Sequence, residues 1–136
     1  MIVVDSSVWI ANLRGQDNAA TRTLHALAAN DDDQLMLGDL ILLEVLQGAR
    51  DEAHAIRIER DLMRFPIVAM LNEKRAVQAA RNYRRLRDRG ITVRKTIDMI
   101  IGTYCLDENH QLLHNDRDFD AMVRHLGLRV IQIATD

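Results

Sequence analysis

The chain has 136 residues, the length of one ordinary domain, and we expect residues 1–136 to form a single domain. It is 48% hydrophobic and 28% charged with a formal net charge of -2, which is typical of a soluble globular protein. No apolar run approaches the roughly 20 residues that span a bilayer, and no secretory leader is recognisable, so we expect no membrane contact. Cys105 is the single cysteine, which excludes an intramolecular disulfide and favours a cytoplasmic location.

The first half of the chain alternates short apolar runs with helical patterns. Strands are expected at residues 1–5 and 35–38, and helices at 7–14, 17–30, 39–47 and 51–64. Asp39 is the expected N-cap of the third helix, and Gly48 lies just beyond its end. The acidic run at 31–33 is expected to be a solvated turn.

The second half continues the same alternation. Strands are expected at residues 67–70, 111–114 and 128–133, and helices at 72–89, 96–109 and 118–126. Thr96 is the expected N-cap of the middle helix of this half. Nearly continuous apolar strands separated by helices indicate an α/β fold, with a mainly parallel sheet of about five strands covered on both faces.

Four acids lie at the junctions between these expected elements. In an open parallel sheet, ligands bind beyond the carboxyl ends of the strands. Asp5 ends the first strand, Asp116 follows the fourth, and Glu44 and Asp98 lie on neighbouring helices. Three of them also have a purely structural interpretation, because Asp5 and Asp116 are placed to cap helices and Asp98 lies in a first helical turn.

Glu44 has no such alternative. It lies too far inside an apolar helix to cap it, and no Lys or Arg lies three or four residues away to pair with it. Clustered carboxylates without a cation repel one another by about 1 kcal/mol or more per close pair. A site with oxygen ligands and no nearby His or Cys suits a hard cation, Mg²⁺ or Mn²⁺.

The segments VVDSSVWI, ILLEVLQG, TIDMIIGTYC and HNDRDF, in this order and spacing, resemble the PIN-domain ribonucleases, and specifically the VapC-type toxins of type II toxin–antitoxin systems. The resemblance covers essentially the whole chain. It implies a three-layer α/β/α sandwich, Mg²⁺- or Mn²⁺-dependent endoribonuclease activity, and inhibition by a cognate VapB-type antitoxin. Family members usually form homodimers.

Matched position by position, the resemblance assigns metal binding and catalysis to Asp5, Glu44, Asp98 and Asp116. Ser6 corresponds to a supporting polar position, and Asp118 to a second, more variable acid. Hydrolysis by a metal-activated water would leave a 5′-phosphate and a 3′-hydroxyl. The five histidines share no spacing that would suit chemistry on the RNA 2′-hydroxyl.

Basic residues are concentrated between positions 74 and 95. This window holds nine of the 18 Lys and Arg residues and one acid, Asp88. Such a block suits a phosphate backbone, although part of it is expected to be an ordinary solvated helix face. Arg94 and Lys95 precede the Asp98 helix directly, so they are the expected RNA contacts near the cut.

Two other classes of α/β protein also place acids after the first strand. Haloacid-dehalogenase-like phosphatases need a second Asp where this chain has Ser7, and receiver domains need paired acids after the first strand. The remaining alternative is a catalytically silent PIN-like module that binds RNA or protein. For the homodimer contact, we expect the apolar side of the helix at 51–64, consisting of Ile56, Ile58, Leu62, Met63 and Phe65.

Overall fold

The computed structural model describes residues 1–30 and 34–133, and the acidic run expected as a turn lies outside these residues. Within these residues, four parallel strands form the sheet, in the order β3-β2-β1-β4. Their bounds are Ile2–Val4 for β1, Leu35–Gly38 for β2, Ile67–Val68 for β3 and Gln111–Leu113 for β4. Every residue of β1 and β2 is buried, so both faces of the central strands are covered.

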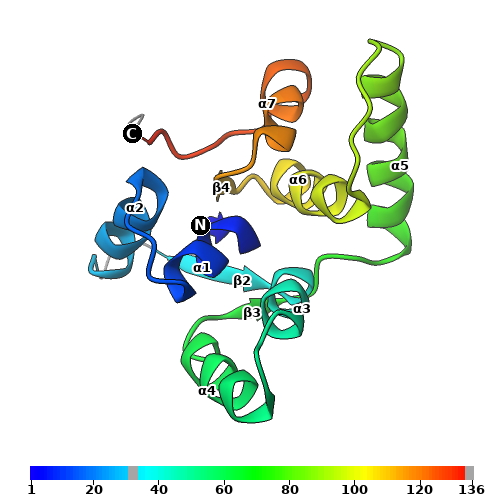
Figure 1. Ribbon diagram of the computed structural model, residues 1–136. Coiled ribbons are helices and arrows are strands. Elements are labelled where there is room, and N and C mark those ends of the chain that lie inside the picture. The colour runs from blue at the N-terminus through cyan, green and yellow to red at the C-terminus, as the bar shows by residue number, and fades with distance from the viewer. Residues whose placement is uncertain (31–33, 134–136) are drawn as a thin grey trace.

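The helices fall into two groups that lie on different sides of the strands (Figure 1). The first group comprises α1 (Ser6–Leu13), α2 (Ala19–Ala28), α3 (Asp39–Gln47) and α4 (Glu52–Leu62). The second comprises α5 (Glu73–Arg87), α6 (Thr96–Glu108), the 3₁₀ turn η1 (Arg117–Phe119) and α7 (Asp120–Leu126). The α/β fold class with a parallel sheet is therefore confirmed.

The expectation of five strands is wrong for the described residues. The segment at 128–133 makes one isolated bridge, in which Val130 pairs with Leu112. Two hydrogen bonds hold it: the amide of Leu112 donates to the carbonyl of Arg129, and the amide of Ile131 donates to the carbonyl of Leu112. Because β4 is only three residues long, it offers this segment little backbone to pair with.

The third strand is shorter than the expected 67–70, because its partner β2 ends at Gly38, opposite Val68, and α3 begins at the next residue. Asp39 does not cap α3, whose N-cap is Gly38. The Asp39 carboxylate accepts hydrogen bonds from the backbone amides of Leu40 and Met70, at 2.8 and 3.1 Å. The Met70 amide is thus held by Asp39, and the pairing of β3 ends at Val68.

Helix α6 is the central helix of the second group. All residues from Asp98 to Cys105 are buried, including the side chains of Ile101 and Thr103. The helix begins at Thr96 with Lys95 as its N-cap, so the expectation that Thr96 is the cap was wrong by one residue. Burial on all sides fixes α6 tightly, and with it the acid in its first turn.

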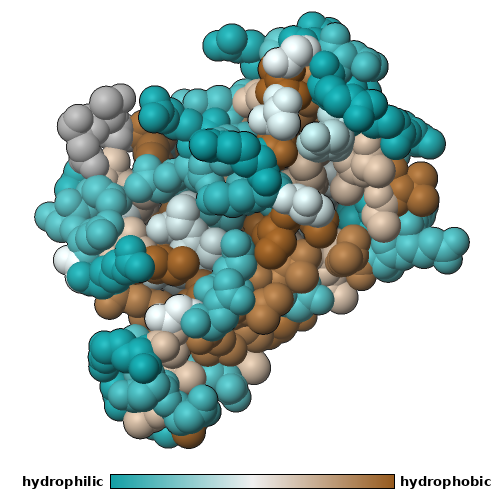
Figure 2. Space-filling view, turned by 45° about the vertical axis from the view of Figure 1, so that its right-hand side comes forward, coloured by the Kyte–Doolittle hydropathy of each residue, from teal (hydrophilic) through white to brown (hydrophobic). Residues whose placement is uncertain are grey.

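Several large apolar side chains remain exposed on the described part of the surface. They include Leu43, Ile56, Met63, Ile67, Leu71 and Val77. Figure 2 shows a broad hydrophobic area, in brown, on the face turned towards the viewer. Trp9, by contrast, is 5% exposed, packs against Phe65 and belongs to the core.

Within the described residues, no helix is both long and apolar enough to cross a membrane.

Candidate metal centre

Four acids from distant parts of the chain line one pocket of about 310 Å³ at the carboxyl ends of β1 and β4. The acids are Asp5, Glu44, Asp98 and Asp116. β1 ends directly before Asp5, and β4 ends three residues before Asp116, so the pairing of these two strands brings both acids to one edge. Helices α3 and α6 supply Glu44 and Asp98 to the same edge.

Asp5 serves both as a helix cap and as a wall of the pocket. Its Oδ2 accepts hydrogen bonds from the Ser7 amide at 3.1 Å and from the Ser7 hydroxyl at 2.6 Å. Its Oδ1 is buried and has no hydrogen-bond partner among the described residues. Burial raises the pKa of Asp5, and the two bonds from Ser7 oppose that rise.

Glu44 is positioned by a serine of another helix. The Ser6 hydroxyl, in the first turn of α1, donates to Glu44 Oε1 at 2.9 Å across the α1–α3 contact. Burial raises the pKa of Glu44, and the negative charge of Asp5 adds to the rise. The supporting polar position expected at Ser6 therefore acts on Glu44, while Ser7 holds Asp5.

Asp98 is a second buried acid of the pocket, and its pKa is strongly raised. It is 3% exposed, in the first turn of α6, and its Oδ2 has no hydrogen-bond partner among the described residues. Burial, together with the charges of Asp5 and Asp116, raises the pKa of Asp98 to about 7. A cation beside Asp98 would lower this pKa and favour the ionised carboxylate at neutral pH.

Asp116 and Asp118 approach Asp98 from the loop after β4. One oxygen of each of these three carboxylates lies within 4.8 Å of the others, which is close enough for shared ligation of one ion. Asp116 Oδ1 also accepts a hydrogen bond from the Asp118 amide at 2.9 Å, as expected of a cap. Asp118, which the resemblance matched to a second acid, thus lies beside two of the main acids. Asp5 and Glu44 line the pocket without joining this tight group.

Two basic side chains reach these acids. Lys95 Nζ lies 3.3 Å from Asp116 Oδ2, and Arg94 Nη2 lies 3.5 Å from Asp118 Oδ1. Both side chains are largely exposed, at 59% for Lys95 and 82% for Arg94. The charge of Asp116 raises the pKa of Lys95, so this ammonium stays protonated at neutral pH. Of the two residues expected to contact RNA, Lys95 therefore lines the acidic pocket, and Arg94 contacts Asp118 beside it.

The donor set fits a divalent cation with a preference for oxygen. The pocket offers carboxylates from four elements and two buried carboxylate oxygens, on Asp5 and Asp98, without another partner among the described residues. Unpaired buried carboxylate oxygens cost several kcal/mol, roughly, unless a cation or donor meets them. Mg²⁺ and Mn²⁺ prefer oxygen ligands, so the residues present suit either ion.

Two residues that the sequence did not single out help to shape the pocket. The Ser7 hydroxyl donates to Asp5 and accepts from the Asn115 amide at 3.1 Å, which joins the start of α1 to the loop after β4. The His114 Nδ1 accepts from the Asp116 amide at 3.1 Å. Burial lowers the pKa of His114, which keeps this nitrogen free to accept. The DSS triplet was the available sequence signal for Ser7, and His114 was the first residue of the HNDRDF segment.

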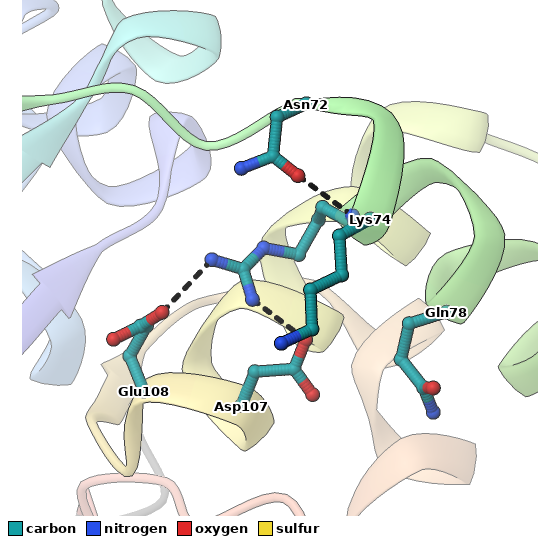
Figure 3. A pocket seen from close by; sticks show the side chains of 6 residues that line it. Asn72, Lys74, Gln78, Asp107 and Glu108 are labelled. Carbon is teal, nitrogen blue, oxygen red and sulfur yellow. Dashed lines mark hydrogen bonds and ion pairs between the residues drawn. The ribbon is translucent and has the colours of Figure 1, made fainter.

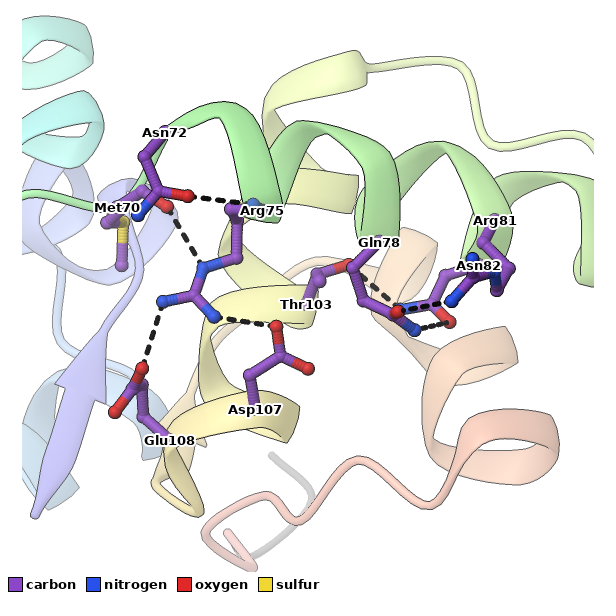
Figure 4. A network of polar contacts seen from close by, with 9 residues as sticks. All are labelled: Met70, Asn72, Arg75, Gln78, Arg81, Asn82, Thr103, Asp107 and Glu108. Carbon is purple, nitrogen blue, oxygen red and sulfur yellow. Dashed lines mark hydrogen bonds and ion pairs between the residues drawn. The ribbon is translucent and has the colours of Figure 1, made fainter.

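A second pocket, of about 370 Å³, lies beside the other end of α6 and contains a buried arginine (Figure 3). The Arg75 guanidinium bonds to the Met70 carbonyl at 3.2 Å, to Asp107 at 2.6 Å and to Glu108 at 3.0 Å (Figure 4). It also lies over the ring of Tyr104. Arg75 is 9% exposed and fully engaged, so this member of the basic block is unavailable to RNA.

The PIN-domain family model matches residues 2–124 of this chain. The chain belongs to the PIN-domain family. Two curated relatives, VapC ribonuclease Mb1587 of Mycobacterium bovis and ribonuclease VapC11 of Mycobacterium tuberculosis, are each 29% identical over 132 residues, covering 95% of this chain and 96% of the relative.

Several solved structures share the fold. VapBC2 of Rickettsia felis, bound to a DNA fragment from its promoter, superposes with a TM-score of 0.76 at 16% identity, covering 96% of this chain and 98% of that one. VapBC-1 of Haemophilus influenzae gives a TM-score of 0.73 at 20% identity, covering 97% of this chain and 98% of that one. VapC20 of Mycobacterium tuberculosis, a toxin that cleaves the sarcin–ricin loop, gives 0.68 at 19% identity, covering 89% and 94%.

Proposed function

We propose that this PIN domain is a Mg²⁺- or Mn²⁺-dependent endoribonuclease and the toxin of a VapBC-type toxin–antitoxin pair. The observation that carries the proposal is the convergence of Asp5, Glu44, Asp98 and Asp116 on one pocket, with two buried carboxylate oxygens that lack partners among the described residues. The curated relatives named VapC ribonuclease support the RNA-cleaving activity.

Each acid has a distinct place in the proposed chemistry. Asp98 and Asp116, with Asp118 beside them, would hold the ion, while Asp5 and Glu44 would bind it directly or through water. A bound divalent ion lowers the pKa of water and stabilises charge on phosphate oxygens. Ser6 keeps the Glu44 carboxylate turned into the pocket, and one of the acids accepts the proton of the attacking water. The expected products carry a 5′-phosphate and a 3′-hydroxyl.

The proposed partner is a VapB-type antitoxin. A free ribonuclease would damage the RNA of its own cell, so the pair requires a tight inhibitor. Several structural neighbours were solved as VapBC or other toxin–antitoxin complexes, which supports a partner of this kind. We also propose a homodimer and a cytoplasmic location, where the RNA substrate is found. We expect the antitoxin to be encoded by the adjacent gene, and coexpression of the two proteins should yield a complex that survives purification.

The activity is tested with total RNA incubated with Mg²⁺ or Mn²⁺, with and without EDTA. We expect cleavage that EDTA abolishes and that Asp5→Asn and Asp98→Asn each reduce at least about a hundredfold, since each removes a charged metal ligand. Asp61→Asn, at an exposed acid of α4, is the matched control and should cleave normally.

The alternative is a catalytically silent PIN-like module that binds RNA or protein. If the RNA stays intact with the wild type, with the variants and in EDTA alike, while the folded protein binds RNA, that alternative is favoured and the nuclease is rejected. Mapping the 5′ ends after brief expression would then identify the substrate if cleavage is found, because the chain itself does not indicate which RNA is cut.

A further inference from the structure

Lys95 occupies an unusual position for a lysine. It is the N-cap of α6, yet its side chain makes no capping hydrogen bond. The side chain instead turns into the acidic pocket, where Nζ lies 3.3 Å from Asp116 Oδ2. The same pocket is lined by Asp5, Glu44 and Asp98.

Helix energetics do not explain this choice of residue. N-caps are preferentially Ser, Thr, Asp or Asn, whose side chains accept from the free amides of the first turn, and lysine has no acceptor. A positive charge at a helix N-terminus is also disfavoured by the helix dipole. The acids of the pocket supply the compensation, because Asp116, Asp98 and Asp118 all stabilise the ammonium.

Arg94 is a weaker candidate for the same role. Its guanidinium contacts Asp118 at a longer distance, 3.5 Å, with 82% of the side chain exposed. It does not line the pocket that Lys95 shares with the four acids. A lysine also suits a mobile role better, because its compact charge sits on a flexible four-carbon stem.

We propose that Lys95 is a tethered cation that competes with the divalent ion for Asp116, and that binding of the ion releases its ammonium to a phosphate of the RNA. This inference rests on the proposed metal centre. The divalent ion prevails because it carries twice the charge and is held by several carboxylates at once. Because Lys95 directly precedes the helix that carries Asp98, the displaced ammonium stays close to the pocket, where the RNA backbone would lie.

Metal binding without RNA provides the first test. Mn²⁺ affinity is measured by electron paramagnetic resonance for the wild type, Lys95→Met, Lys95→Arg and Lys74→Met. Removing the competing charge should tighten Mn²⁺ binding by about threefold to tenfold in Lys95→Met. Lys95→Arg keeps the charge and should bind like the wild type, as should Lys74→Met, which removes an exposed lysine at the far end of α5.

RNA binding provides a second test that a purely structural role would not affect. The affinity for a single-stranded RNA is measured against salt concentration, in EDTA and in Ca²⁺, which is used to slow cleavage. In Ca²⁺ the salt slope of Lys95→Met should be smaller than that of the wild type by about 0.7, the loss of one phosphate contact. In EDTA the wild type and Lys95→Met should have the same salt slope, because Lys95 then remains paired with Asp116 and does not contact the RNA.

The outcomes separate this inference from the proposed function. If the wild type binds Mn²⁺ and Lys95→Met binds it with the same affinity, the competition is refuted and the metal centre stands. Equal salt slopes in Ca²⁺ refute the release to phosphate. If the wild type binds no Mn²⁺ at all, the metal centre and the role of Lys95 fail together.

Discussion

The acids of the pocket divide their oxygens between two tasks. Asp5 uses Oδ2 to cap α1 through Ser7, and its Oδ1 stays buried without a partner among the described residues. Asp116 likewise caps the turn at η1 with one oxygen and meets Lys95 with the other. Helix capping by Asp5 and Asp116 therefore does not exclude metal binding by the same residues. A carboxylate with one oxygen fixed by the backbone presents the other in a defined direction.

Asp98 makes the stability of the protein depend on pH. Its folded pKa of about 7 lies above the ordinary value of 3.8, so between these values the folded chain holds a proton that the unfolded chain has released. Stability in EDTA should therefore fall as the pH rises from about 4 to about 7. Asp5 and Glu44 act in the same direction, since burial raises both pKa values.

Asp98→Asn tests this dependence, since it removes the ionisable group. At about pH 8 in EDTA the variant should be more stable than the wild type by about 2 kcal/mol, and its pH profile should be flatter. Added Mn²⁺ should raise the melting temperature of the wild type and leave that of the variant nearly unchanged. Calorimetry measures the free energy of unfolding of both proteins as a function of pH. If it depends on pH equally in the two proteins, the pKa assigned to Asp98 is wrong.

At the scale of elements, the position of Asp98 depends on how α6 is held. The buried side chains of α6 pack into the core, and Arg75 attaches its C-terminal end to the start of α5. Further along, Asn82 of α5 donates to Thr103 of α6 at 3.0 Å, in a buried contact. Charged and polar contacts thus fix the register between α5 and α6, the most closely packed pair of helices.

Replacing Arg75 should destabilise the fold through this contact. Arg75→Met leaves Asp107, Glu108 and the Met70 carbonyl without their donor. The two acids are partly exposed, at 33% and 49%, so we expect a loss of about 2–3 kcal/mol rather than the full cost of a buried charge.

Urea unfolding measures this loss, and Arg81→Met on the same helix is the matched control. Arg81 is exposed and bonds only to Gln78 among the contacts found here, so its replacement should change the free energy of unfolding by less than about 0.5 kcal/mol. Equal losses in the two variants would show that the Arg75 network adds no stability.

At the scale of the whole molecule, the exposed apolar surface bears on assembly. The contact expected on α4 is only partly available, because Ile58 and Leu62 are buried in the core. Ile56 and Met63 remain exposed, at 55% and 52%. A separate apolar groove of about 550 Å³ runs between α5 and α6 and includes Leu71.

We expect a homodimer that uses the exposed residues of α4. The double variant Ile56→Glu/Met63→Glu should be monomeric by size-exclusion chromatography with light scattering, because it places charge in an apolar contact. Leu71→Glu is the matched control in the α5–α6 groove and should remain dimeric. If Leu71→Glu alone is monomeric, the interface lies in the groove instead, and a monomeric wild type rejects the dimer altogether.

The sequence by itself determined the alternation of elements and the identity of the acids. Apolar runs, helical periodicity and the VVDSSVWI and TIDMIIGTYC segments are local signals, and they predicted the parallel α/β fold correctly. Errors arose where a distant segment limited strand pairing. The chain turns from β2 into α3 after Gly38, which leaves residues 69–70 without a partner strand, and the short β4 restricts the pairing of residues 128–133.

Only the tertiary structure decided which groups meet. The strand order places β1 between β2 and β4, and this neighbourhood brings Asp5 beside the loop that carries Asp116. The inward turn of Arg75, the Ser6–Glu44 bond and the approach of Lys95 to Asp116 join residues 21 to 38 positions apart. Sequence patterns report on neighbours along the chain, whereas charge compensation acts through space, so the pairing of these charges followed only from the folded chain.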